Sequence, residues 1–240
     1  MNTNVKLEAA AGVLALMGGC LVLLLLGLLA AHALFKRRTA RARKVALVAL
    51  AGGAVYLGGV LAFSAASAER VLAGGEEKYF CEIDCHLAYA VVGVRKAKTL
   101  GRAPGEATAA GEFYVVNVRT RFDENTVSPR RDDRPLTPNA RAATVFDSEG
   151  RSYAPSPEGL RALELSGEAG PPLSTLLRPG ESYTTALVFD LPPGAREPVL
   201  LLNESSLPTR FIIGHENSLL HGRTKFHIEP RAESAARPAE

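Results

Sequence analysis

The sequence predicts a mainly β fold, an antiparallel β-sandwich of about seven strands, preceded by two transmembrane α-helices. Three observations lead to this expectation. Two long apolar runs stand near the start, a cluster of basic residues separates them, and the rest of the chain alternates short β-branched and aromatic segments with Gly, Pro, Asp and Asn.

The two apolar runs cover residues 10–35 and 45–66, and neither contains Asp, Glu, Lys or Arg. Each exceeds the roughly 20 residues that an α-helix needs to cross a bilayer. The loop between them, residues 36–44, reads KRRTARARK and carries six basic residues and no acid. Because Lys and Arg concentrate in short cytoplasmic loops, we expect this loop to be cytoplasmic. The hairpin 10–66 then makes the chain an integral protein of the inner or plasma membrane.

This orientation places both ends of the hairpin outside the cytoplasm. Residues 1–9 form an N-terminal tail, and the C-terminal part is expected to be extracytoplasmic, either periplasmic or extracellular. Two alternatives stay open. The first run is a candidate signal peptide, although it is longer than the roughly 7–15 residues of an h-region and lacks a positively charged lead. The sequence AASA at 65–68 resembles a signal-peptidase site after the second run.

The part beyond the hairpin is mildly acidic, because the basic loop accounts for more than the formal net charge of +3. It has no dense basic patch, which argues against a nucleic-acid partner. We expect 67–79 to be a linker, 80–229 to be one extracytoplasmic β-sandwich with its own core, and 230–240 to be a disordered tail.

Within 80–229 the strands are expected where β-branched and aromatic residues alternate with polar ones. A hairpin with its turn at Asp147–Gly150 and a short helix over Glu158–Leu165 are also expected, with long loops at Arg95–Gly111 and Asn125–Asn139. The expected strands are Phe80–Val94, Glu112–Phe122, Ala142–Asp147, Ser182–Asp190, Pro198–Asn203, Arg210–Gly214 and Thr224–Glu229.

Three blocks of this region resemble a known family: FYVVNVRTRF, VFDSEGRSYAPS and LRPGESYTTALVFDLPPG. In order and character they are similar to the DUF4352 domains, which are bacterial extracytoplasmic immunoglobulin-like domains. The resemblance covers roughly Cys85 to Asn203. It implies an immunoglobulin-like β-sandwich outside the cytoplasm, and it brings no catalytic residues, because the family has no shared chemistry to transfer.

The segment CEIDCH, residues 81–86, is the most chemically suggestive part of the chain. The thiolates of Cys81 and Cys85 with the imidazole of His86 suit copper and, less well, zinc. His215 or His221, both in the segment GHENSLLH, would complete such a site if the late strands return beside the first one.

The Cys-x3-Cys spacing is similar to the copper loops of cytochrome oxidase subunit II and of Sco-type copper-delivery proteins. Only Cys81 and Cys85 match as copper ligands. Tyr89 stands where the oxidase loop has a His, and His86 stands where the Sco pattern has Pro. The resemblance is therefore one of spacing.

Three interpretations of the two thiols stay open. On a regular strand both would face the core, about 13 Å apart, too far for a disulfide or for one shared metal. A turn or a helical start at Cys81–Cys85 would instead permit a metal or redox site, or a local disulfide. Free thiols are unusual in an oxidising compartment, which weighs against the first interpretation.

No motif for common catalysis is present: there is no G-x-S-x-G, P-loop, H-E-x-x-H or dinucleotide fingerprint. We therefore expect no catalytic residues and no enzyme. The preferred hypothesis is a non-enzymatic binding module that meets a protein partner at the outer membrane surface. The alternative is a copper-binding or thiol-redox protein that uses Cys81, Cys85 and His86 with His215 or His221.

Overall fold

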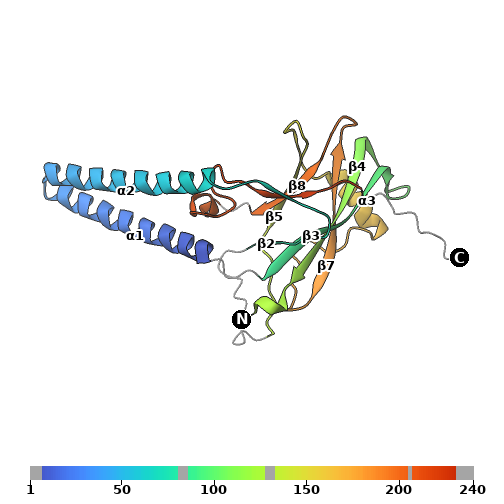
Figure 1. The fold of residues 1–240 in the computed structure, drawn as a ribbon, viewed down its shortest axis with the longest axis horizontal. Helices are drawn as coiled ribbons and strands as arrows, with labels where there is room; N and C mark the ends of the chain where they lie inside the picture. Colours follow the sequence, from blue (N-terminus) through green and yellow to red (C-terminus); the bar gives the residue numbers. More distant parts are fainter. Residues whose placement is uncertain (1–6, 81–85, 128–132, 205–206, 231–240) are drawn as a thin grey trace. The chain divides into compact units, whose positions relative to one another are not determined.

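A computed structural model describes residues 7–80, 86–127, 133–204 and 207–230, and these divide into two compact units (Figure 1). The first, the hairpin unit, comprises 7–69 and 207–223 of the described residues. The second, the sheet domain, comprises 70–80, 86–204 and 224–230 of them.

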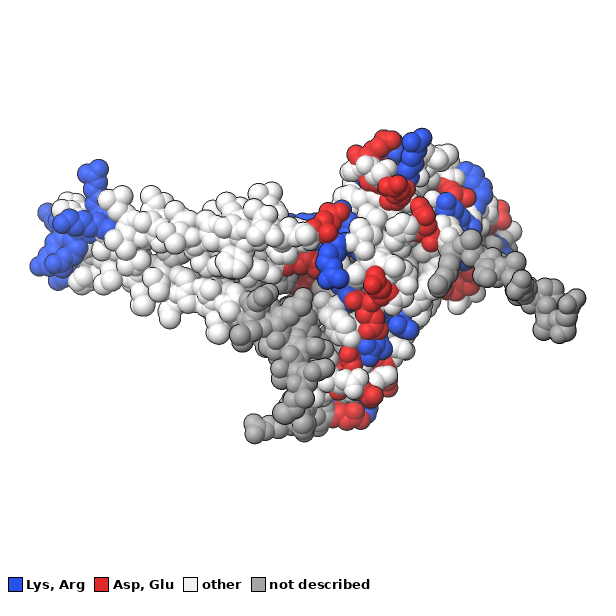
Figure 2. Space-filling model, viewed as in Figure 1, with Lys and Arg blue, Asp and Glu red and all other residues white. Residues whose placement is uncertain are grey.

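The hairpin unit contains the two helices that the apolar runs predict, α1 (Leu7–Phe35) and α2 (Thr39–Ala65). By length and composition, Ala11–Phe35 and Thr39–Ala65 could each cross a membrane. The connection is a turn of three residues, Lys36–Arg38, so residues 39–44 of the expected 36–44 loop are helical instead. Most large apolar side chains of both helices are exposed, as in helices that face lipid. The Lys and Arg residues of the two helices and their turn all lie within 36–44, and a cluster of basic side chains marks the closed end of the hairpin (Figure 2).

The sheet domain contains two sheets, and among its described strands every pair is antiparallel except β1 with β9. The four-stranded sheet has the order β2 (Lys78–Phe80), β3 (Leu87–Leu100), β4 (Ala107–Phe122), β7 (Ser182–Leu191). The five-stranded sheet has the order β1 (Arg70–Leu72), β9 (Thr224–His227), β8 (Val199–Glu204), β5 (Arg141–Phe146), β6 (Ser152–Tyr153).

The alternation of β4 divides its side chains between two apolar clusters. Tyr114, Val116 and Val118 belong to the main core, which also contains residues of both sheets such as Phe189, Val145, Leu200 and Phe226. Phe113 and Val115 point to the opposite face and pack under helix α3 (Pro157–Ser166). The four-stranded sheet is therefore buried on both faces along this stretch.

Helix α3 and the β5–β6 hairpin confirm their sequence predictions. The hydroxyl of Ser156 accepts a hydrogen bond from Gly159 N–H at the start of α3, Pro157 occupies its first turn, and Gly167 ends it at φ 77°. In the hairpin, the Gly150 N–H donates to Asp147 O at 3.0 Å, which closes the expected turn.

Three expectations about loops and strands are wrong. Arg95–Gly111 is not a long loop, because β3 and β4 continue as one hairpin as far as Leu100 and Ala107, where they pair. Phe80–Val94 is not one strand: β2 ends at Phe80, β3 begins at Leu87, and 81–85 lie outside the described residues. The 3-10 helix η2 (Pro208–Phe211) and turns replace the strand expected at Arg210–Gly214, since Pro208 favours a helical first turn.

The expected limits of the domain also differ from the structure. Residues 67–79, predicted as a linker, contain β1 and the beginning of β2. Residues 207–223, placed by the sequence in the β-sandwich, group with the hairpin unit instead.

Candidate functional site

Strand β5 is open along part of its outer edge. On one side, β8 pairs with the whole of Arg141–Phe146. On the other side, β6 pairs only with Val145 and Phe146. The Asp147 N–H donates to Arg151 O across this hairpin, so the alternation of an antiparallel strand directs the backbone N–H and C=O of Ala143 and Arg141 to the same outer edge. In the described part of the chain, no strand pairs with that edge.

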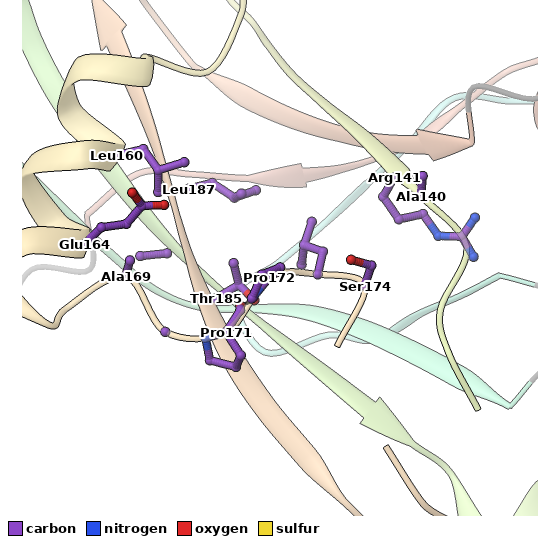
Figure 3. Close-up of a pocket in the computed structure, with 13 residues that line it drawn as sticks. Ala140, Arg141, Leu160, Glu164, Ala169, Pro171, Pro172, Ser174, Thr185 and Leu187 are labelled. Atoms are coloured by element: carbon purple, nitrogen blue, oxygen red, sulfur yellow. Dashed lines mark hydrogen bonds between the residues drawn. The ribbon is translucent and has the colours of Figure 1, made fainter. Parts of the chain in front are cut away.

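A pocket of about 320 Å³ lies beside the start of this strand (Figure 3). Four elements form its walls: the beginning of β5, helix α3, a loop after α3, and the middle of β7. The lining residues are Ala140, Arg141, Leu160, Glu164, Ala169–Ser174 and Thr185–Leu187.

The loop 169–174 that forms one wall is bonded to the outer edge of β7. The Ala186 N–H donates to Ala169 O at 2.8 Å, and the Thr185 hydroxyl donates to Pro171 O at 2.5 Å. Gly170 has φ 68°, and a Cβ at this position would clash with the backbone of β7 at Thr184. The loop therefore closes the edge of β7, whereas the edge of β5 on the other sheet stays open.

The walls of the pocket are mostly apolar, with Arg141, Ser174 and Thr185 as polar residues and Glu164 as the one carboxylate. Leu160, Leu187 and the two prolines Pro171 and Pro172 supply the apolar surface, and the exposed Glu164 of α3 supplies the carboxylate (Figure 3). An open strand edge beside an apolar pocket is the arrangement with which proteins bind an extended peptide as an added strand.

A separate polar cluster joins side chains at the beginning of β2 to side chains at the end of β4, on the other side of β3. The Arg121 guanidinium donates to Glu77 at 2.9 and 2.6 Å, and the Tyr79 hydroxyl donates to Asp123 at 2.7 Å. The hydrogen bond from Arg121 lowers the pKa of Glu77. Burial raises the pKa of Asp123, but hydrogen bonds from Tyr79, Arg121 and Asn125 outweigh it and lower the pKa overall. The groups of this cluster satisfy one another, so we interpret it as structural.

Of the predicted metal ligands, Cys81 and Cys85 lie outside the described residues. His86 is buried in the sheet domain just before β3. Its Nδ1 lies 2.6 Å from the Thr126 hydroxyl, and its ring stacks on Phe122 with the centroids 5.5 Å apart. The structure therefore assigns His86 packing and hydrogen-bonding contacts within its own unit.

His215 and His221 belong to the hairpin unit, in the segment after η2. Nδ1 of His215 accepts a hydrogen bond from Asn217 N–H at 3.0 Å, and Nδ1 of His221 donates to Gly222 O at 2.6 Å. Among the residues that the structure describes, no three His, Cys, Asp or Glu side chains come together in a way that could hold a metal. The copper-site hypothesis remains a prediction.

Sequence reasoning did not find the open edge of β5 or its pocket. One signal was present: Pro155 follows Tyr153 closely, and a proline cannot donate to a strand ladder. It limits β6 to Ser152 and Tyr153, which is too short to cover β5.

The described residues define a class of protein with two membrane-length apolar helices and a domain of two mostly antiparallel sheets. No protein-family model matches the chain, and no curated protein matches it either.

Several solved structures are similar. The secreted protein MPT63 from Mycobacterium tuberculosis has 11% sequence identity over 65% of this chain and 97% of its own, with a TM-score of 0.38. The yjhA protein from Bacillus subtilis has 12% sequence identity over 65% of this chain and 98% of its own, with a TM-score of 0.39. A conserved hypothetical protein from Bacillus anthracis has 15% sequence identity over 55% of this chain and 94% of its own, with a TM-score of 0.39. At TM-scores this low, the likeness identifies neither a fold family nor a function.

Proposed function

We propose that this chain is a membrane-anchored extracytoplasmic binding module, and not an enzyme, which captures an extended segment of a protein partner at the open edge of β5. In this proposal the sheet domain is an immunoglobulin-like β-sandwich of the DUF4352 type. The observation that carries the proposal is the edge at Ala143 and Arg141, with which none of the described strands pairs, beside the apolar pocket.

The recognition would combine two kinds of contact. The backbone groups of Ala143 and Arg141 that point outward would pair with an incoming strand, and each such hydrogen bond contributes about 0.5–1.5 kcal/mol net. Because side chains alternate along a strand, every second side chain of the ligand would face the same side, and one of them would enter the pocket. The exposed carboxylate of Glu164 would disfavour acidic residues at that position.

The anchor would place the domain at the outer membrane surface. Both helices are long and apolar enough to cross the bilayer, and Lys and Arg cluster at the turn that joins them. By the positive-inside rule, this turn would be cytoplasmic and the sheet domain extracytoplasmic, at the inner or plasma membrane. A partner at that surface would meet a domain that cannot diffuse away.

A peptide library tests this proposal on the full chain in lipid nanodiscs. We expect selection from random heptapeptides to enrich sequences with a central apolar residue and high strand propensity. Ala143→Pro removes an outward N–H at an edge position where proline is tolerated, and it should weaken the binding of a selected peptide several-fold to about tenfold.

Leu187→Ala, on the pocket wall, should also weaken binding. Leu165→Ala is the matched control, because Leu165 is exposed on α3 and does not line the pocket. The proposal is wrong if no peptide is enriched. It is equally wrong if Ala143→Pro and Leu187→Ala both fold, as seen in their circular dichroism, and bind the selected peptides as well as the parent chain.

A further inference from the structure

The segment Leu207–Arg223 is held against both helices of the hairpin unit. The Tyr56 hydroxyl of α2 donates to Phe211 O at 2.8 Å. On α1, Gly12 is buried against Ile213, and a Cβ there would clash with the Ile213 carbonyl. This segment therefore packs at the open end of the hairpin, where it contacts α1 and α2 together.

The contact between Phe211 and Tyr56 lies more than two helical turns before the C-terminal end of α2. Tyr56 is 12 residues beyond Lys44, the last basic residue before the apolar run. At 1.5 Å per residue this is about 18 Å along the helix, whereas the hydrocarbon core is about 30 Å thick. If Lys44 marks the cytoplasmic boundary of the core, the opposite boundary lies near Ser64. Phe211, bonded to Tyr56, is then at the depth of the outer leaflet.

Apart from Arg210, the large side chains that the segment exposes most are apolar, whereas Glu216 and Arg223 are only partly exposed. Leu220 is 83% exposed and Leu207 is 63% exposed, and Leu219 and Phe211 are also exposed to more than a third. In water these side chains would be an unfavourable surface, but against acyl chains they require no cover. Arg210 is exposed too, and its long side chain can extend to the headgroups while its stem stays apolar.

Several polar groups of the segment, in contrast, bond to one another inside it. Asn217 Nδ2 donates to the Thr209 hydroxyl at 3.2 Å, and the Ser218 hydroxyl donates to Ile212 O. Asn217, Ser218 and Thr209 are all buried. Backbone that is not helical is tolerated at membrane depth only where its polar groups are satisfied within the protein, and these internal hydrogen bonds meet part of that requirement.

We propose that Leu207–Arg223 is a third membrane element, which immerses its apolar side chains in the outer leaflet at the open end of the hairpin. We expect lipid acyl chains to cover this apolar surface, because it is continuous with two helices of membrane length. The inference rests on the proposed membrane anchoring of the hairpin and deepens it. The anchor then consists of the two helices and the segment 207–223.

Tryptophan fluorescence tests the inference directly, because the chain contains no Trp and a single introduced Trp reports alone. We would compare Phe211→Trp and Leu220→Trp in the full chain, reconstituted in liposomes with and without phospholipids brominated along their acyl chains. We expect blue-shifted emission from both variants and strong quenching by the brominated lipids.

Two further variants make the outcomes distinguishable. Leu24→Trp lies in the middle of α1 and must be quenched if the hairpin is embedded, whereas Leu176→Trp is exposed in the sheet domain and should stay unquenched. If Leu24→Trp is quenched but Phe211→Trp and Leu220→Trp are as little quenched as Leu176→Trp, the segment 207–223 is not in the membrane. The proposed anchoring by the two helices would still hold. If Leu24→Trp also escapes quenching, the proposed anchoring fails and the inference fails with it.

Discussion

Arg141 and Glu204 form an ion pair across the register of β5 and β8 in which both side chains are almost fully buried, at 3% and 4% exposure. The Arg141 guanidinium lies over the Phe80 ring, 4.1 Å from its centroid. Nearby, the buried Lys78 donates to the carbonyls of Leu202 and Thr224 at 2.9 Å each. Charged side chains that are this deeply buried require partners. These contacts therefore hold Arg141, the first residue of β5, in its position opposite Glu204 of β8.

Replacing one member of this pair should destabilise the sheet domain strongly. Arg141→Ala leaves the buried Glu204 carboxylate without its guanidinium partner, and such changes cost about 3–5 kcal/mol of unfolding free energy. Urea unfolding of the full chain in detergent, followed by near-ultraviolet circular dichroism, measures this loss.

The double variant Arg141→Met with Glu204→Leu is the control, because replacing both charges by apolar groups is often close to neutral. An Arg141→Ala variant as stable as the parent chain would show that the pair contributes little. A double variant as unstable as the single one would point to packing rather than charge.

The cluster of Glu77, Asp123 and Arg121 should make the domain sensitive to acid. Folding lowers the pKa of both carboxyl groups, so their contribution to stability is fully present above their unfolded values near pH 4 and is lost as the pH falls through their folded values. We expect the urea midpoint to drop on acidification below about pH 4, and to drop less steeply in Arg121→Met.

The matched control for this experiment is Arg178→Met. Arg178 pairs with Asp133 at 3.8 Å, but both side chains are more than half exposed, and exposed pairs contribute little. An acid profile that Arg121→Met and Arg178→Met alter equally would contradict the assignment of the acid sensitivity to this cluster.

Gly159 allows α3 to approach the four-stranded sheet. A Cβ on Gly159 would lie 2.6 Å from Val188 Cγ1 and 3.1 Å from the Phe113 ring. Gly159→Ala should therefore destabilise the domain by about 1–3 kcal/mol, as overpacking of a core does. Because α3 forms a pocket wall, the variant should also weaken peptide binding. Gly194→Ala, which meets nothing within 4 Å, should leave both measurements unchanged.

The copper hypothesis and the binding-module proposal predict different results for the thiols. If the chain is a binding module, we expect the full chain to bind no stoichiometric Cu(I) or Zn(II) under reducing conditions. The double variant Cys81→Ser with Cys85→Ser should then keep its affinity for a selected peptide. Tight, near-stoichiometric copper that is lost in this variant and in His86→Gln would instead establish a copper-handling role.

The sequence by itself determined the elements whose signal is local. Two uninterrupted apolar runs determined most of α1 and α2, because an apolar run of more than 20 residues is typical of a helix long enough to cross a membrane. The alternation in FYVVNVRTRF determined the two faces of β4, and the Ser156 cap with Gly167 at the other end determined α3. Each of these signals is contained within a few turns or a few residues of chain.

Only the tertiary structure decided which segments pair. Arg95–Gly111 has the charges, glycines and proline of a loop, yet most of it is strand, because β3 and β4 supply each other with hydrogen-bond partners. The open edge of β5 has only the indirect signal of Pro155, and the grouping of 207–223 with the hairpin unit has no local signature. The segment 207–223 joins the hairpin unit through contacts such as that of Phe211 with Tyr56, 155 positions apart in the sequence. Periodicity records which side of a segment is buried, but the partner that buries it is chosen by contacts between distant parts of the chain.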